Sequence, residues 1–184
     1  MSASFEDLIG PLLEREGGYV DDPRDAGGET CWGVTRKVAR AAGYDGEMRD
    51  MGRERAIAIY RDRYWTRPGL DRIARVNPCV AARLFDISVN MGAAAAVSFL
   101  QRALNILNRG GRDYPDVAVD GVAGPGLIRA LGAFLRQRGP PGEAVLLAAL
   151  TCLQGARYLE LAEARPADEA FEFGWFANRI LRPA

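Results

Sequence analysis

Apolar residues recur at intervals of three and four along most of the chain, and this spacing predicts amphipathic helices. The first such run consists of Phe5, Leu8, Ile9, Leu12 and Leu13. Ser4 with Asp7 predicts the start of this helix as a capped N-terminus, and Gly17-Gly18 predicts its end. Pro11 either kinks the helix or marks the first turn of its regular part.

The same pattern predicts further helices over 36–42, 53–65, 78–92, 93–108, 143–164 and, after Pro166, up to Ile180. Alternating strand patterns are nearly absent. We therefore expect an all-α fold with at most a small β-hairpin in the loop after the first helix. Gly139-Pro140-Pro141-Gly142 is the clearest linker, and polar residues interrupt the apolar helix beyond it too often for a membrane span.

The loop over 17–35 is rich in glycine and carboxylates, and it directly follows Glu16 on the last turn of the first helix. The negative end of the helix dipole and the neighbouring Leu12, Leu13 and Tyr19 are expected to raise the pKa of this carboxyl group. A carboxyl group that keeps its proton near neutral pH suits a general acid. The alternative is a solvated glutamate at a helix end, followed by ordinary acidic turn residues.

Composition excludes several classes of function. The chain has 184 residues, 24 basic and 24 acidic side chains, and no histidine. It therefore has neither a histidine-based triad nor histidine metal ligands, and we predict no metal site, no cofactor and no nucleic-acid partner. Cys31, Cys79 and Cys152 are widely spaced and odd in number, as expected of reduced thiols rather than a disulfide framework.

The first residues contain neither the basic region nor the long apolar run of a secretory signal. We therefore expect the protein to fold in the cytoplasm, and to require help from another component if its target lies outside the membrane.

The string from Glu16-Gly17-Gly18-Tyr19 to Gly33-Val34-Thr35 closely resembles a motif of the glycoside hydrolase family 108 N-acetylmuramidases, EGGY…D…GG-x-T-x-x-G-[IV]-T. This family is lysozyme-like, and the resemblance implies that Glu16 is the catalytic acid. It also implies a phage-type lysis enzyme that waits in the cytoplasm for a holin pore.

Two further stretches resemble family motifs. Leu84-Phe85-Asp86 to Asn90-Met91-Gly92 is similar to LFD-x-x-x-N-x-G, and residues 174–179 are similar to GW-x-x-R. Asp86 and Asn90 share a helix face. There they either contact the sugar or form hydrogen bonds across helices or to backbone groups. Trp175 is expected in the core.

The C-terminal half is similar to a small peptidoglycan-binding region, with Gln101, Asp120-Gly121 and Gly124-Pro125 in matching places. Leu127 replaces the usual threonine of that region, so we expect this segment to serve packing here. The predicted organisation is a catalytic region over 1–92 and a peptidoglycan-binding-like region over 93–184, packed as one unit.

The resemblance implies hydrolysis of the β-1,4 bond between N-acetylmuramic acid and N-acetylglucosamine in peptidoglycan glycan strands. Asp25 is the first choice for the second catalytic group, because phage-type lysozymes place an acid at the same spacing with a threonine soon after. Thr30 would hold the attacking water, and Asp21 and Asp22 compete with Asp25. Tyr19 and Trp32 are candidate sugar contacts.

Three other functions remain open at this point. A lytic transglycosylase would use one glutamate on the same substrate and give an anhydro sugar. A non-catalytic wall-binding or secretion-related module would need no acid at all. A cysteine peptidase around Cys31 ranks last because no histidine is present to activate the thiol.

Overall fold

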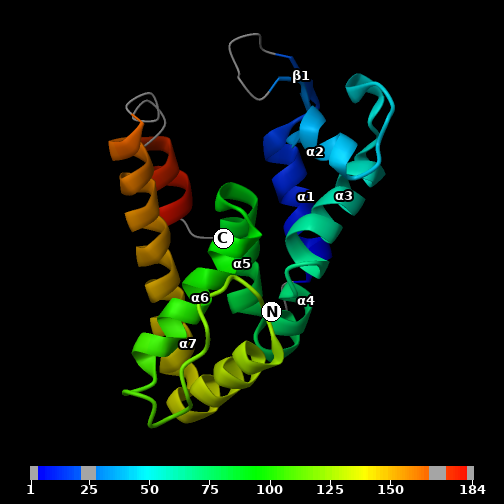
Figure 1. Ribbon diagram of the computed structural model, residues 1–184. Coiled ribbons are helices and arrows are strands. Elements are labelled where there is room, and N and C mark those ends of the chain that lie inside the picture. The colour runs from blue at the N-terminus through cyan, green and yellow to red at the C-terminus, as the bar shows by residue number, and fades with distance from the viewer. Residues whose placement is uncertain (1–3, 22–27, 166–172, 182–184) are drawn as a thin grey trace. The chain divides into compact units, whose positions relative to one another are not determined.

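The computed structural model describes residues 4–21, 28–165 and 173–181. The chain divides into two compact units, unit 1 over Met1–Arg67 and unit 2 over Pro68–Ala184. Helices dominate both units, and the described strands form one small sheet in unit 1 (Figure 1). The predicted all-α, lysozyme-like class is therefore confirmed.

Unit 1 begins with α1 (Phe5–Glu16), whose capping box is the one predicted from Ser4 and Asp7. The Asp7 carboxylate accepts a hydrogen bond from the Ser4 backbone N–H at 2.9 Å, and the helix continues through Pro11. The other helical elements of the unit are α2 (Arg36–Ala41), the 3-10 turn η1 (Met48–Asp50), α3 (Arg53–Arg61) and the π-helical turn η2 (Asp62–Thr66).

The loop after α1 forms a three-stranded antiparallel sheet, one strand more than the predicted hairpin. Its strands are β1 (Tyr19–Val20), β2 (Thr30–Cys31) and β3 (Val34–Thr35), with Tyr19 opposite Cys31 and Thr30 opposite Thr35. Facing residues in antiparallel strands share a side of the sheet. Because Cys31 and Val34 are buried, Tyr19 lies on the inner side and Thr30 on the outer side.

Unit 2 is built on α5 (Pro78–Met91), in which every residue from Val80 to Ser88 is buried. Helices α4 (Leu70–Val76), α6 (Ala93–Leu107) and α7 (Pro125–Ala164) pack against it. The π-helical turn η4 (Phe176–Ile180) lies along the second half of α7 (Figure 1).

Helix α7 consists of two helices joined at Gly139, whose φ of 61° and ψ of −157° interrupt the helical backbone. Figure 1 shows the two halves running in different directions. The predicted linker over 139–142 is thus reduced to one non-helical residue, since Pro140 and Pro141 already belong to the second half. Their fixed φ suits the first turn of a helix.

By length and composition alone, the 40 residues of α7 are apolar enough to cross a membrane. Within unit 2, however, one face of its second half packs into the core. Leu146, Leu150, Gln154 and Tyr158 recur along one buried face, and Gln154 and Tyr158 hydrogen-bond each other at 3.1 Å.

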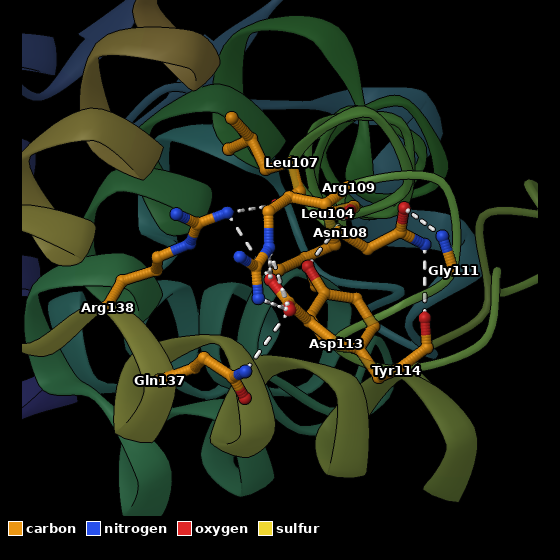
Figure 2. A network of polar contacts seen from close by, with 9 residues as sticks. All are labelled: Leu104, Leu107, Asn108, Arg109, Gly111, Asp113, Tyr114, Gln137 and Arg138. Carbon is orange, nitrogen blue, oxygen red and sulfur yellow. Dashed lines mark hydrogen bonds and ion pairs between the residues drawn. The ribbon is translucent and has the colours of Figure 1, made fainter.

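The loop between α6 and α7 has no regular structure, and a buried carboxylate fixes it (Figure 2). The side chain of Asp113 is 1% exposed and forms ion pairs with Arg109 and, at 3.3 Å, with Arg138 of α7. Gln137 donates a further hydrogen bond to the same carboxylate at 3.1 Å. The hydrogen bond from Arg109 is the main cause that holds the pKa of Asp113 below its usual range, and the positive charge of Arg138 acts in the same direction.

The Asp113→Asn variant tests the contribution of this carboxylate to stability. A lowered pKa in the folded state adds stability that is present above the unfolded pKa of about 3.9 and is lost as pH falls through the folded pKa. We therefore expect Asp113→Asn to lower the melting temperature of the protein at pH 7, and the difference from wild type to shrink on acidification below about pH 4. Thermal unfolding followed by circular dichroism, at pH 7 and below about pH 4, measures this difference in melting temperature.

Glu163→Gln, which neutralises an exposed carboxylate of α7, is the control and should change little. A difference between Asp113→Asn and wild type that persists unchanged in acid would show that the ion pairs do not carry the effect.

Candidate active site

Glu16 is the last residue of α1 and lies beside the sheet of unit 1. Gly17, with φ of 71°, stops the helix, and its N–H donates to the Leu13 carbonyl at 3.1 Å. Leu12 and Leu13 are buried, but Glu16 itself is exposed. The expected loss of water around this carboxyl group was therefore wrong: the leucines face the core, and Glu16 points to solvent where a substrate can reach it.

The turn between β2 and β3 lies directly next to Glu16. Its two central residues both have positive φ, 53° at Trp32 and 72° at Gly33, as in a type I′ hairpin turn. A non-glycine residue in this region is unusual and needs support from its surroundings. Trp32 has it, because its backbone N–H donates to Gly18 at 3.2 Å and its indole N–H to the Met51 carbonyl at 2.9 Å.

Gly33 allows Glu16 and Tyr60 to approach the turn. A Cβ atom at position 33 would lie 2.6 Å from the Tyr60 hydroxyl oxygen and 2.9 Å from Cγ of Glu16. The Tyr60 hydroxyl donates to the Trp32 carbonyl at 3.2 Å. Three segments far apart in the sequence, the end of α1, the β2–β3 turn and α3, thus meet at one point.

Tyr60 is 3% exposed, and its pKa is raised mainly by burial and further by the negative charge of Glu16. It therefore remains a neutral hydroxyl throughout the physiological pH range. The sequence placed Tyr60 only on the apolar face of its helix. No signal in the sequence showed that its hydroxyl would reach the β2–β3 turn beside Glu16.

Tyr19 of β1 is held by Glu29, which directly precedes β2. Its hydroxyl donates to Glu29 at 3.1 Å, and Glu29 is also bound by the guanidinium of Arg36. The hydrogen bond from Arg36 is the main cause that lowers the pKa of Glu29. The Arg49 guanidinium carbon lies 5.7 Å from the centre of the Tyr19 ring. Glu29 is therefore an ionised residue that positions Tyr19.

The remaining predicted residues of unit 1 differ in what the structure shows of them. Thr30 is half-buried on the outer side of the sheet. Asp21 is exposed at the end of β1. Asp25 and Asp22 lie outside the described residues. Their roles, and those of Tyr19 and Trp32 as sugar contacts, stay predictions.

Cys31 is buried under the sheet, where its thiol contacts the Met51 carbonyl at 3.7 Å. Burial raises the pKa of this thiol. Because the thiolate is the nucleophilic form, this environment disfavours a cysteine peptidase around Cys31.

Asp86 and Asn90 both belong to α5 in unit 2. Asp86 is 7% exposed, and its carboxylate accepts hydrogen bonds from Arg179 of η4 at 2.5 Å and from Arg83 at 3.4 Å. Arg83 also donates to Gln154 of α7 at 2.6 Å. Asp86 and Arg83 of α5 therefore together connect this helix to η4 and α7.

Asn90 is exposed and donates to the Asp86 backbone carbonyl within its own helix at 2.6 Å. A role of either residue in sugar binding stays a prediction. Trp175 stacks on Tyr158 with 5.0 Å between ring centres, and Leu127 is buried at the start of α7.

Two family models match successive parts of the chain. Residues 9–92 match the family Glycosyl hydrolase 108, and residues 95–180 match the family Predicted Peptidoglycan domain. No curated protein matches the sequence. Among solved structures, SagA of Brucella abortus is similar in fold, with a TM-score of 0.71 and 24% identity over 97% of this chain and 90% of that chain.

The family boundary and the structural boundary fall at different places. The first family match ends at residue 92, after α5, whereas the structural units divide after Arg67. The predicted division at residue 92 stays a prediction.

The substitution Gly33→Ala tests the close approach at the turn. Strain at positive φ together with the clash against Tyr60 and Glu16 should lower the free energy of unfolding by about 3 kcal/mol. The matched control is Gly28→Ala, because Gly28 has a similar φ of 69° but no described residue within 4 Å of a built Cβ atom. The control should cost about 1 kcal/mol in chemical denaturation. Equal losses in the two variants would mean that the space between Glu16 and Tyr60 is not constrained.

Proposed function

We propose that this chain, which matches the family Glycosyl hydrolase 108 over residues 9–92 and the family Predicted Peptidoglycan domain over residues 95–180, is an N-acetylmuramidase. The two family matches support peptidoglycan as its substrate and a peptidoglycan-degrading glycosidase as its coarse class. The finer proposal is that it hydrolyses the β-1,4 bond between N-acetylmuramic acid and N-acetylglucosamine.

The observation that carries this proposal is the position of Glu16. Its carboxyl group is exposed at the end of a helix that is buried along one face, next to a constrained turn and a neutral tyrosine hydroxyl. A general acid must be reachable by substrate and held in place by a rigid frame. Helix α1, the β2–β3 turn and Tyr60 together supply such a frame.

In the proposed mechanism, Glu16 donates its proton to the glycosidic oxygen as the bond from this oxygen to the anomeric carbon breaks. The anomeric carbon develops oxocarbenium character, and a water molecule adds to it after losing a proton to a second group. Asp25 is proposed as this second group and Thr30 as a holder of the water. Thr30 is available for this, because it lies on the outer side of the sheet.

A lytic transglycosylase is the second candidate, and one observation favours it. Glu29, the carboxylate adjacent to Thr30, is already bound by Arg36 and Tyr19. In a transglycosylase no water-activating carboxylate is needed, because the 6-hydroxyl of the muramic acid attacks the anomeric carbon and forms a 1,6-anhydro sugar. A wall-binding or secretion-related module without catalysis is the third candidate.

We also propose that the protein waits in the cytoplasm and reaches the wall through a holin pore. The resemblance to phage-type lysis enzymes supports this route. Lysis of producing cells without any membrane permeabilisation would contradict it.

Mass spectrometry of the products released from purified peptidoglycan tests the proposed activity. We expect the wild type to release fragments that end in reducing N-acetylmuramic acid. Glu16→Gln keeps the shape of the side chain but has no acidic proton, so the release rate should fall by about 100-fold or more. The control Glu14→Gln removes an exposed carboxyl group two residues earlier on the same helix and should retain activity.

Each other outcome contradicts a defined part of the proposal. Products that end in 1,6-anhydro-N-acetylmuramic acid would show that the protein is a lytic transglycosylase. Equal activity in Glu16→Gln and wild type would exclude Glu16 as the acid. If the wall stays intact after incubation with the folded wild-type protein, the non-catalytic module is the candidate that remains.

A further inference from the structure

A groove of about 800 Å³ lies in unit 2 between the α6–α7 loop and the first half of α7. This is a volume typical of ligand-binding sites. We propose that the groove binds the stem peptide of peptidoglycan rather than its glycan strand. The proposal rests on the proposed function only in taking peptidoglycan as the target, and it concerns a surface other than that of Glu16.

The loop wall of the groove is held by side-chain amides of α6. Asn105 exchanges two hydrogen bonds with the backbone of Val117, at 2.8 and 2.9 Å. Gln101 accepts from the N–H groups of Asp120 and Gly121 at 3.1 and 2.9 Å. Asn108 donates to the Tyr114 carbonyl at 3.2 Å. These amides replace the neighbouring strand that an extended segment would otherwise need, so the wall is preformed.

The Asp113 ion pairs fix the same wall against the other side of the groove. Arg138, which binds Asp113 (Figure 2), stands near the end of the first half of α7. Residues of that half form the opposite wall of the groove. The groove therefore does not depend on a ligand to form. A preformed site loses little conformational entropy on binding.

The two walls carry opposite charges. Asp116 and Asp120 line the loop side, whereas Arg129 and Arg136 line the helix side. Each aspartate uses its Oδ1 atom for internal hydrogen bonds, Asp116 with Asn108 at 2.6 Å and Asp120 with Gln101 at 2.7 Å. Both arginines are exposed. A ligand that fits must therefore carry negative groups on one side and a positive group on the other.

Between the charged walls the lining is mostly small and apolar, with Val122, Leu127, Ala130 and Ala133 among its residues. Tyr114 is the aromatic residue among those described as lining the groove, and it is 7% exposed with its hydroxyl bound to the Leu104 carbonyl. The groove thus lacks an open aromatic face of the kind that stacks on sugar rings.

The chemistry of peptidoglycan decides between its two parts. The glycan strand is uncharged, because the lactyl carboxyl group of muramic acid is joined to the peptide as an amide. The stem peptide has free carboxylates, the ammonium group of its diamino acid and the methyl groups of its alanines. These groups complement the arginines, the aspartates and the small apolar lining, respectively.

Isothermal titration calorimetry with a synthetic stem pentapeptide, L-Ala–D-Glu–L-Lys–D-Ala–D-Ala, tests the proposal. We expect the full-length wild type to bind this peptide and to bind its C-terminal amide form more weakly. The double substitution Arg129→Ala with Arg136→Ala should weaken binding by about tenfold or more. The control, Arg102→Ala with Arg157→Ala, removes the same charge from exposed positions that do not line the groove and should bind as wild type.

Two results would overturn the proposal. One is the absence of peptide binding at millimolar concentration; the other is equal binding by the groove variant and the wild type. Cleavage of glycan is measured on the same samples, so a wild type that cleaves glycan but does not bind the peptide contradicts the groove assignment alone. Peptide binding without cleavage contradicts the proposed hydrolase alone.

Discussion

At Gly33 the backbone of the β2–β3 turn lies so close to Glu16 and Tyr60 that a single methyl group would not fit. This constraint defines the candidate active site. It requires a glycine at positive φ, a helix that ends at Glu16, and a third helix that delivers a buried hydroxyl group to the turn. The hydrogen bonds of Trp32 to Gly18 and Met51 hold its strained backbone, and the buried Cys31 and Val34 anchor the inner side of the sheet.

Unit 2 uses buried polar groups for a comparable purpose, to fix segments that have little regular structure of their own. Asp113 ties the α6–α7 loop to α7, and Asp86 ties η4 to α5. Buried ion pairs gain little stability over apolar contacts of the same size, but they fix one arrangement because an unpaired buried charge is costly. Within the described part of the chain, the buried Nε atom of Arg83 has no partner, although its two other nitrogens are bonded.

The sequence predicted the elements that depend on local signals. The capping box at Ser4, the end of α1 at Gly17 and the helical faces of α5 and α6 follow from short-range pattern and agree with the structure. It did not predict contacts between distant segments, such as Tyr60 with the β2–β3 turn, because pattern shows which face is buried and not what that face meets. It placed Glu16 near water-excluding leucines, and Glu16 does share the helix face of Leu12 and Leu13, but as the last residue of α1 it is exposed. The amides Gln101 and Asn105 of α6, with Asn108 directly after its end, show a missed signal: amide residues spaced four and three apart indicate a helix face that binds a backbone.

The central claim is that Glu16 is the proton donor of a peptidoglycan glycosidase. A crystal structure of the Glu16→Gln protein with a bound glycan tetrasaccharide of alternating N-acetylglucosamine and N-acetylmuramic acid tests it most directly. The account predicts the side-chain amide at position 16 within about 3.2 Å of a glycosidic oxygen that joins the anomeric carbon of N-acetylmuramic acid to N-acetylglucosamine. A tetrasaccharide bound productively elsewhere on the chain, with no glycosidic oxygen near position 16, would contradict it.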